Sequence, residues 1–180
     1  MKYYIHGYMS EPNSTKGTLF KNKLNVKPIK YRDCKPEELV ISDCLNRIKK
    51  EIKDDNSPML IGSSLGGFLA AKTAQINDNV KQLVLLNPAI IPASYDISKI
   101  KDMPQSILFD MQDASLFDKK IKANIFILIG TTDDVVPNSW VLEFAKTQEA
   151  KVMFLHDDHS FSNKIDQLPS IIAREIDKKH

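Results

Sequence analysis

Glycine is scarce in this sequence. Only 6 of its 180 residues are glycine, whereas average usage of about 7% would give roughly 13. So few glycines exclude a collagen-like or glycine-rich low-complexity chain. A hydrophobic fraction of 42% and a charged fraction of 27% exclude a disordered chain. Because about 150 residues make a domain, we expect residues 1–180 to form a single domain with a core that can support a cleft.

Arginine and net charge are also low. Of the 25 basic residues only Arg32, Arg47 and Arg174 are arginine, and 23 acidic residues leave a formal charge of +2. Phosphate binding needs a clustered excess of cations, and bidentate recognition of phosphate or guanine favours arginine. The lysines are scattered in short runs. We therefore expect no nucleic-acid partner.

Cysteines and long hydrophobic runs are few. Cys34 and Cys44 have neither the number nor the spacing of a disulfide scaffold or a metal finger. The start of the chain is too polar for an export signal, and the longest apolar runs are too short to span a membrane. We expect a cytoplasmic protein without a membrane span. No pattern indicates an oligomeric state.

Short β-rich runs alternate with helical patterns, which is typical of a parallel sheet built from βαβ units. Residues 83–86 and 125–129 are continuously apolar, as in strands covered on both faces. We predict strands at Tyr3–His6, Val26–Tyr31, Met59–Gly62, Gln82–Asn87, Asn124–Gly130 and Lys151–His156. We predict helices at Ser14–Leu24, Pro36–Ile52, Leu65–Ile76, Pro137–Thr147 and Pro169–Lys178.

The least regular stretch is Pro88–Lys120, which contains three prolines. It could form two short helices that arch over the edge of the sheet. Residues 92–120 are the only segment long enough to act as a small lid.

Residues 62–67 read Gly-Ser-Ser-Leu-Gly-Gly between a predicted strand and a predicted helix. This is the sequence and the context of a G-x-S-x-G nucleophile elbow. Its sharp turn holds the central serine in a strained conformation, and side chains two positions before and after it would collide with the main chain. Ser64 is therefore the candidate nucleophile. Ser63 is the competing hydroxyl, but it is not centred between the glycines.

A serine nucleophile needs a base, and the base needs an acid that holds its tautomer. With this elbow the chain order is serine, acid, histidine, with the partners in loops after later strands. Asp133 and Asp134 follow one such strand, and either could be the acid. His159 stands in the loop after the last predicted strand, whereas His156 still belongs to the strand end. We therefore assign His159 as the base.

Two further features complete the candidate site. Gly7 follows the first predicted strand and permits close backbone approach, so we expect the backbone N–H groups of Tyr8 and Leu65 to form an oxyanion hole. The cluster His156, Asp157, Asp158 and His159 could instead bind a metal. No other set of ligand residues has the spacing to complete such a site, so we expect neither a metal nor a cofactor.

Together these residues resemble the α/β-hydrolase superfamily and, more narrowly, the small, largely lidless YqiA-like esterases. The resemblance rests on residues 6–16 (HGYMSEPNSTK), 62–67, 86–89 (LNPA), 130–137 and 158–161 (DHSF). It implies Asp133 as the acid, with Asp134 second, and His159 as the base. It also implies a minimal α/β-hydrolase fold of about six parallel strands with helices on both faces. Residues 92–120 match no family pattern.

The resemblance implies hydrolysis of carboxylic esters, usually short-chain acyl esters, through a Ser-His-Asp triad and an acyl-enzyme intermediate without a cofactor. The expected partner is a small-molecule ester. Two alternatives stay open: a thioesterase or amidase with the same triad, and a non-catalytic interaction protein on a hydrolase fold. Seven apolar side chains could line an acyl pocket or simply pack in the core: Tyr8, Met9, Met111, Phe117, Val136, Trp140 and Phe161.

Overall fold

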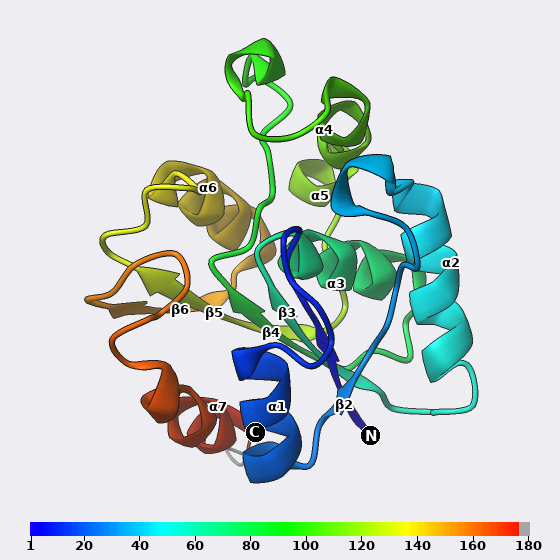
Figure 1. Cartoon of the computed structure of the whole chain (residues 1–180), viewed down its shortest axis with the longest axis vertical. Coiled ribbons are helices and arrows are strands. Elements are labelled where there is room, and N and C mark those ends of the chain that lie inside the picture. Colours follow the sequence, from blue (N-terminus) through cyan, green and yellow to red (C-terminus); the bar gives the residue numbers. More distant parts are fainter. Residues whose placement is uncertain (177–180) are drawn as a thin grey trace.

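The structure is a computed structural model, and it describes residues 1–176. Within them, six strands form one parallel sheet in the order β2-β1-β3-β4-β5-β6 (Figure 1). The strands are β1 Lys2–Ile5, β2 Lys27–Pro28, β3 Met59–Ser63, β4 Gln82–Leu86, β5 Asn124–Gly130 and β6 Lys151–Leu155. The predicted parallel sheet of about six strands is therefore confirmed.

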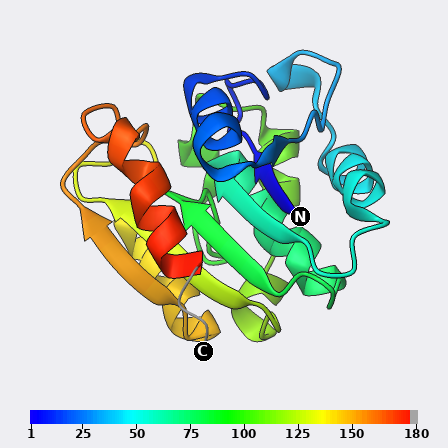
Figure 2. The same cartoon turned by 90° about the horizontal axis from the view of Figure 1, so that it is seen from below.

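Both faces of the sheet are buried at β1, β3, β4 and β5: successive strand residues point to opposite sides, and in these strands nearly all of them are enclosed. Tyr4, Ile61, Val84 and Phe126 form one row across β1, β3, β4 and β5, and all four are buried. This face is covered by α1 Thr15–Leu24 and α7 Leu168–Ile176, which lie in front of the sheet in Figure 2. The alternate residues face the larger core.

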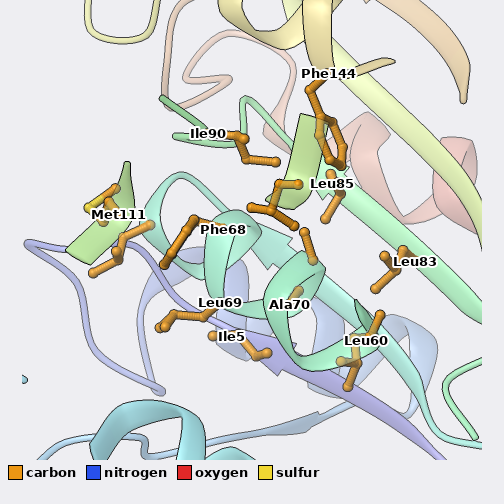
Figure 3. Close-up of a cluster of buried hydrophobic side chains, with 14 of the residues drawn as sticks. Ile5, Leu60, Phe68, Leu69, Ala70, Leu83, Leu85, Ile90, Met111 and Phe144 are labelled. Atoms are coloured by element: carbon orange, nitrogen blue, oxygen red, sulfur yellow. The ribbon is translucent and has the colours of Figure 1, made fainter. Parts of the chain in front are cut away.

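The larger core lies under α2 Ile41–Ile52, α3 Leu65–Ile76 and α6 Asn138–Gln148. Helix α3 is buried along most of its length and packs against β1, β3 and β4. Figure 3 shows its Phe68 and Leu69 among side chains from the strands, with Met111 beside them. This central helix leads directly out of the predicted serine elbow, so the elbow is anchored to a helix that is buried in the core.

Two predicted elements are shorter than expected. Only Lys27–Pro28 pairs as a strand within Val26–Tyr31; β2 is an edge strand, and Pro28 has no N–H to extend the ladder. The helix predicted at Pro36–Ile52 is a 3-10 turn at Pro36–Glu38 followed by α2. Leu39 separates the two with an extended backbone and a buried side chain. The predicted end of the last helix, Lys178, lies outside the described residues.

Residues 92–120, here called the cap, contain a 3-10 turn η2 at Ile97–Lys99 and two short helices, α4 Gln105–Met111 and α5 Ser115–Asp118. The prediction of two short helices in this region is thus confirmed. The cap stands above α3 and α6 in Figure 1. It is fastened to the core by buried side chains of α4 and α5, which are Ile107, Leu108, Met111 and Leu116.

No helix within residues 1–176 is both long enough and apolar enough to cross a membrane.

Candidate active site

The loops that follow β1, β3, β4, β5 and β6 meet at one edge of the sheet, because the carboxyl ends of parallel strands lie together. We call this edge the rim and define it as residues 6–11, 63–67, 87–89, 130–137 and 156–164. A cavity of about 1080 Å³ opens there. Ser64, His159 and Tyr8 all line it, and cap residues form part of its wall.

Ser64 lies between β3 and α3 with φ 55° and ψ −122°, a backbone conformation that few non-glycine residues adopt. Its N–H donates to the Leu86 carbonyl at 3.0 Å, and its own carbonyl accepts from the Ala89 N–H at 3.0 Å. The end of β4 therefore holds this strained residue from both sides. The turn has the sharp strand-to-helix geometry that the sequence predicts.

Two positions of the elbow have no room for a side chain and therefore require glycine. A Cβ on Gly62 would lie 2.3 Å from the Gly66 carbonyl oxygen, and a Cβ on Gly66 would lie 2.0 Å from that of Ile5. No glycine within residues 1–176 has a positive φ. The predicted collision between side chains and main chain at these two positions is confirmed. Glycine allows β1, β3 and α3 to approach closely around Ser64.

Asp133 and His159 are brought together although 26 residues separate them. His159 Nδ1 lies 2.8 Å from Asp133 Oδ2, and the carboxylate is almost fully enclosed, with a side-chain exposure of 1%. The other carboxylate oxygen accepts the N–H groups of Val135 at 2.8 Å and Val136 at 2.9 Å. These donors fix the carboxylate, so that a proton on His159 Nδ1 leaves Nε2 as the basic nitrogen.

Three neighbouring side chains, those of Asp134, His156 and Asp157, lie outside the Asp133–His159 pair. Asp134 is exposed at the mouth of the cavity. His156 Nδ1 lies 3.0 Å from Thr131 Oγ1. Asp157 is buried; burial alone raises the pKa of its carboxyl, but N–H donors of Asp158, Asn163 and Lys164 outweigh it and hold that pKa below its usual value. The Asp157 carboxylate therefore holds the His159 loop together.

The loop after β1 passes directly beside Ser64, since a Cβ on Gly7 would lie 3.3 Å from Ser64 Cβ. The Gly7 carbonyl accepts hydrogen bonds from His6 Nδ1 at 2.9 Å and the Tyr31 hydroxyl at 3.2 Å. In a trans peptide the following N–H points the opposite way. Anchoring this carbonyl therefore orients the Tyr8 N–H away from Tyr31, and within the described residues no protein acceptor binds it.

Arg32 also holds this loop, a role that the sequence did not predict. Its buried guanidinium donates to the carbonyls of Tyr8 at 3.2 Å, Ser10 at 2.8 Å and Cys34 at 2.8 Å. It also forms an ion pair with Glu11 at 3.2 Å. One of only three arginines thus holds the backbone around Tyr8. No local pattern predicts this role, because Arg32 and the loop are more than 20 residues apart in the sequence.

Five of the seven predicted pocket residues line the cavity, and two pack in the core instead. Tyr8, Met9, Met111, Val136 and Trp140 line the cavity. Phe117 instead packs against Phe144, and Phe161 is fully buried in the smaller core. Cap residues add apolar wall, and Tyr95 meets Trp140 edge to face with ring centroids 4.5 Å apart. The cavity therefore has polar groups at the rim, and its cap wall combines apolar side chains with three charged ones, Lys99, Lys101 and Asp102.

Comparison with protein families places nearly the whole chain in one group. The family described as "Uncharacterised protein family (UPF0227)" matches residues 1–175. A "UPF0227 protein" of Shewanella woodyi is 27% identical over 131 residues, which are 72% of this chain and 72% of that protein.

Solved structures with the same fold include esterases and lipases. Est1E from Butyrivibrio proteoclasticus, solved with bound ferulic acid, has a TM-score of 0.79 at 19% identity over 97% of this chain and 87% of its own. Mouse alpha/beta hydrolase domain-containing protein 10 has a TM-score of 0.80 at 20% identity over 98% and 89%. A monoacylglycerol lipase of Paleococcus ferrophilus has a TM-score of 0.76 at 15% identity over 97% and 93%. At these identities the likeness shows a shared α/β-hydrolase fold.

Proposed function

The chain belongs to the UPF0227 family, and from that premise we propose that it is a serine hydrolase of carboxylic esters with the triad Ser64, His159 and Asp133. One observation carries the proposal. A serine in a strained strand-to-helix turn and a histidine whose Nδ1 lies 2.8 Å from a buried carboxylate line the same cavity. Strained residues of this kind cluster at active sites, and the set has the roles and the chain order of a hydrolase triad.

The chemistry follows from the protonation of His159. With Nδ1–H donating to Asp133, Nε2 accepts the Ser64 proton as the hydroxyl oxygen attacks the ester carbonyl carbon. The resulting imidazolium is stabilised by the Asp133 carboxylate, and it returns the proton to the leaving alcohol. Water then attacks the acyl-enzyme with His159 again as base, which releases the carboxylic acid and restores Ser64.

We propose that the N–H groups of Tyr8 and Leu65 bind the oxyanion. Leu65 opens α3, so its N–H has no acceptor within the helix and lies at the positive end of the helix dipole. The Tyr8 N–H is oriented by the anchored Gly7 carbonyl. Loss of one oxyanion donor typically costs ~10²–10³ in rate.

The acyl group is expected against the apolar wall formed by Ile91, Tyr95, Met111 and Trp140. Short-chain esters fit this cavity, and its volume of about 1080 Å³ leaves room for longer chains. A series of p-nitrophenyl esters from acetate upward therefore measures which acyl length the wall accepts.

Labelling with a fluorophosphonate probe tests the proposal, because such probes react only with an activated serine. We expect labelling at Ser64 in the wild-type protein, none in Ser64→Ala and little in His159→Gln. Labelling that persists in Ser64→Ala would contradict the assignment. A wild-type protein that takes no label and cleaves no ester, thioester or amide would instead favour the non-catalytic alternative.

A further inference from the structure

We propose that Asn87 is a positioning residue that joins the loop of the catalytic acid to the loop of the catalytic base. The inference rests on the proposed triad and adds to it a residue that does not touch the reacting atoms. Asn87 follows β4 directly and is buried, with an exposed fraction of 1%. It belongs to the LNPA segment at residues 86–89, and the sequence alone indicates no chemical role for its side-chain amide.

The Asn87 side chain makes contacts with both loops. Its Oδ1 accepts the N–H of Gly130 at 2.7 Å, at the end of the strand that leads to Asp133. Its Nδ2 donates to the carbonyls of His159 at 3.0 Å and Asp158 at 3.3 Å. A single amide thus sets the distance between the start of the acid loop and the backbone of the catalytic base.

The junction of the two loops is also sterically tight. A Cβ on Gly130 would lie 2.7 Å from the carbonyl oxygens of both Asp157 and Asp158, and 3.1 Å from Asn87 Nδ2. The two loops are therefore in direct backbone contact where the amide binds them. A shift of either loop would change the separation of His159 and Asp133, which are only a few residues further along.

Asparagine suits this position for two reasons. The junction needs one acceptor and one double donor on a short side chain, and a carboxylate has no donor while a hydroxyl cannot reach both loops. The backbone also has φ 43°, in the left-handed region where asparagine and aspartate are several-fold enriched among non-glycine residues.

Asn87 is also next to the nucleophile turn. The carbonyl of Leu86 accepts the Ser64 N–H, and the Ala89 N–H donates to the Ser64 carbonyl. The same four-residue segment therefore contacts Ser64 through its main chain and the other two triad loops through one side chain. In this arrangement Asn87 fixes the positions of the three triad residues relative to one another.

The chain offers a matched control in Gln148, a second buried amide with the same hydrogen-bond pattern. Gln148 Oε1 accepts the Ile121 N–H at 2.8 Å, and its Nε2 donates to the carbonyls of Leu116 at 2.7 Å and Lys119 at 2.9 Å. It is 7% exposed and fastens the end of the cap to α6. Gln148 does not line the cavity.

The test compares the isosteric variants Asn87→Asp and Gln148→Glu. Each keeps the acceptor for one backbone N–H and replaces the amino group that serves two carbonyls. Both are measured well below their unfolding temperatures, with kcat and KM for the p-nitrophenyl ester that the wild-type protein cleaves fastest. Proton NMR monitors the downfield resonance of the His159 Nδ1 proton, assigned by its loss in His159→Gln.

We expect Asn87→Asp to lower kcat by about 10²-fold, the cost of a misplacement of ~1 Å in a catalytic group, with little change in KM. The His159 resonance should shift or broaden in this variant. Gln148→Glu should lose similar thermal stability yet keep both kcat and the resonance. If Asn87→Asp does not fold, Asn87→Gly, which tolerates the positive φ, is measured in its place.

Two results would overturn the inference: a kcat and a resonance that match the wild type in the Asn87 variant, or equal losses in the Gln148 variant. A wild-type protein that cleaves no ester would refute the proposed function. The resonance would then still decide whether Asn87 positions His159 against Asp133.

Discussion

The rim and the cap surround the same cavity but differ in how much they depend on polar and on apolar contacts. The rim is fixed by buried polar groups that bind backbone atoms of distant loops, as Arg32 binds Tyr8 and Ser10. Within the cap, Gln112 donates to the carbonyls of Pro92, Ala93 and Tyr95, and Gln105 donates to those of Ile97 and Ile100, so these bonds stay local. Apolar side chains of α4 and α5 pack into the core, and polar contacts join them at α5, where Gln148 and Gln75 donate to backbone carbonyls within residues 115–119.

The two kinds of contact suit different functions. Buried hydrogen bonds are directional and costly to break, so they suit loops whose atoms must hold a fixed geometry. Apolar packing tolerates changes of shape when volume is conserved. We therefore expect changes to the buried hydrogen bonds that hold the rim loops to act on kcat, and changes in the cap to act on substrate choice.

The largest effect is expected for Ser64→Ala. Removal of the nucleophile should lower the turnover of an activated ester by ~10⁴-fold or more, which leaves only what binding and the oxyanion hole contribute. Ser63→Ala is the control, because Ser63 is buried on β3 beside the turn. Steady-state assays of both variants check this. Most of the wild-type rate remaining in Ser64→Ala would remove the serine mechanism altogether.

Two adjacent carboxylates allow the next test. Asp133→Asn should lower kcat by about 10⁴-fold, because an amide at this position stabilises the wrong tautomer of His159. Asp134→Asn should stay close to the wild-type rate, since Asp134 is exposed and makes no contact with the imidazole. The reverse ranking of the two kcat values would transfer the role of acid to Asp134.

Arg32→Met tests whether the rim depends on residues outside the triad. Without the guanidinium the carbonyls of Tyr8 and Ser10 lose their donors. The Tyr8 N–H would then be placed less accurately, and we expect kcat to fall by about 10- to 100-fold, less than complete loss of an oxyanion donor. Arg47→Met is the control, because Arg47 is exposed and pairs with Asp33.

A rise in KM at constant kcat in Arg32→Met would show that Arg32 supports substrate binding rather than the oxyanion loop. Equal losses in Arg47→Met would point to a general effect of removing an arginine.

The rim was largely predictable from the sequence, whereas for the cap only the presence of two short helices could be predicted. Gly62, Ser64 and Gly66 stand in one short window, and the steric demands of the turn leave little choice of residue there. Asp133 and His159 could be placed because parallel strands end at a common edge, although only the structure shows their contact. Arg32 and Asn87 act on backbone atoms far along the chain, which no spacing rule encodes.

The cap lacks such local signals. Its helices are short, with 7 residues in α4 and 4 in α5, and its order depends on packing against α3 and α6. The β2 strand and the start of α2 were misplaced for the same reason. Tertiary contacts of Leu39 and the edge position of Pro28 override the local pattern there.

A moderate effect is expected from the cap. Tyr95→Ala removes an aromatic ring that packs on Trp140 in the cavity wall. We expect KM for longer p-nitrophenyl esters to rise about tenfold, equivalent to ~1.4 kcal/mol of lost contact, with kcat for the acetate ester retained. Phe109→Ala is the control, because Phe109 is exposed on α4 and does not line the cavity. A large loss of kcat for acetate would mean that the cap also shapes the rim.

The smallest effect concerns stability and tests whether the rim depends on a neutral buried group. His6 is fully buried and stacks on Tyr31 with ring centroids 4.3 Å apart. Burial is the main cause that lowers the pKa of His6 below its ordinary value of 6.5, and the charge of Arg32 acts in the same direction, against Glu11 and the Gly7 carbonyl. In the unfolded chain His6 is therefore protonated at a pH at which the folded protein keeps it neutral.

Stability rises with pH wherever the unfolded state binds more protons, so the His6 contribution should decrease as the pH falls below about 6.5. One proton corresponds to at most about 1.4 kcal/mol per pH unit. Urea unfolding between pH 7.5 and 5, taken here as roughly the range in which histidine titrates, should show a shallower decline in His6→Asn than in the wild type. Equal slopes in the two proteins would mean that the oxyanion loop can hold a charged His6, and its rigidity would then have to come from Arg32 and Tyr31 alone.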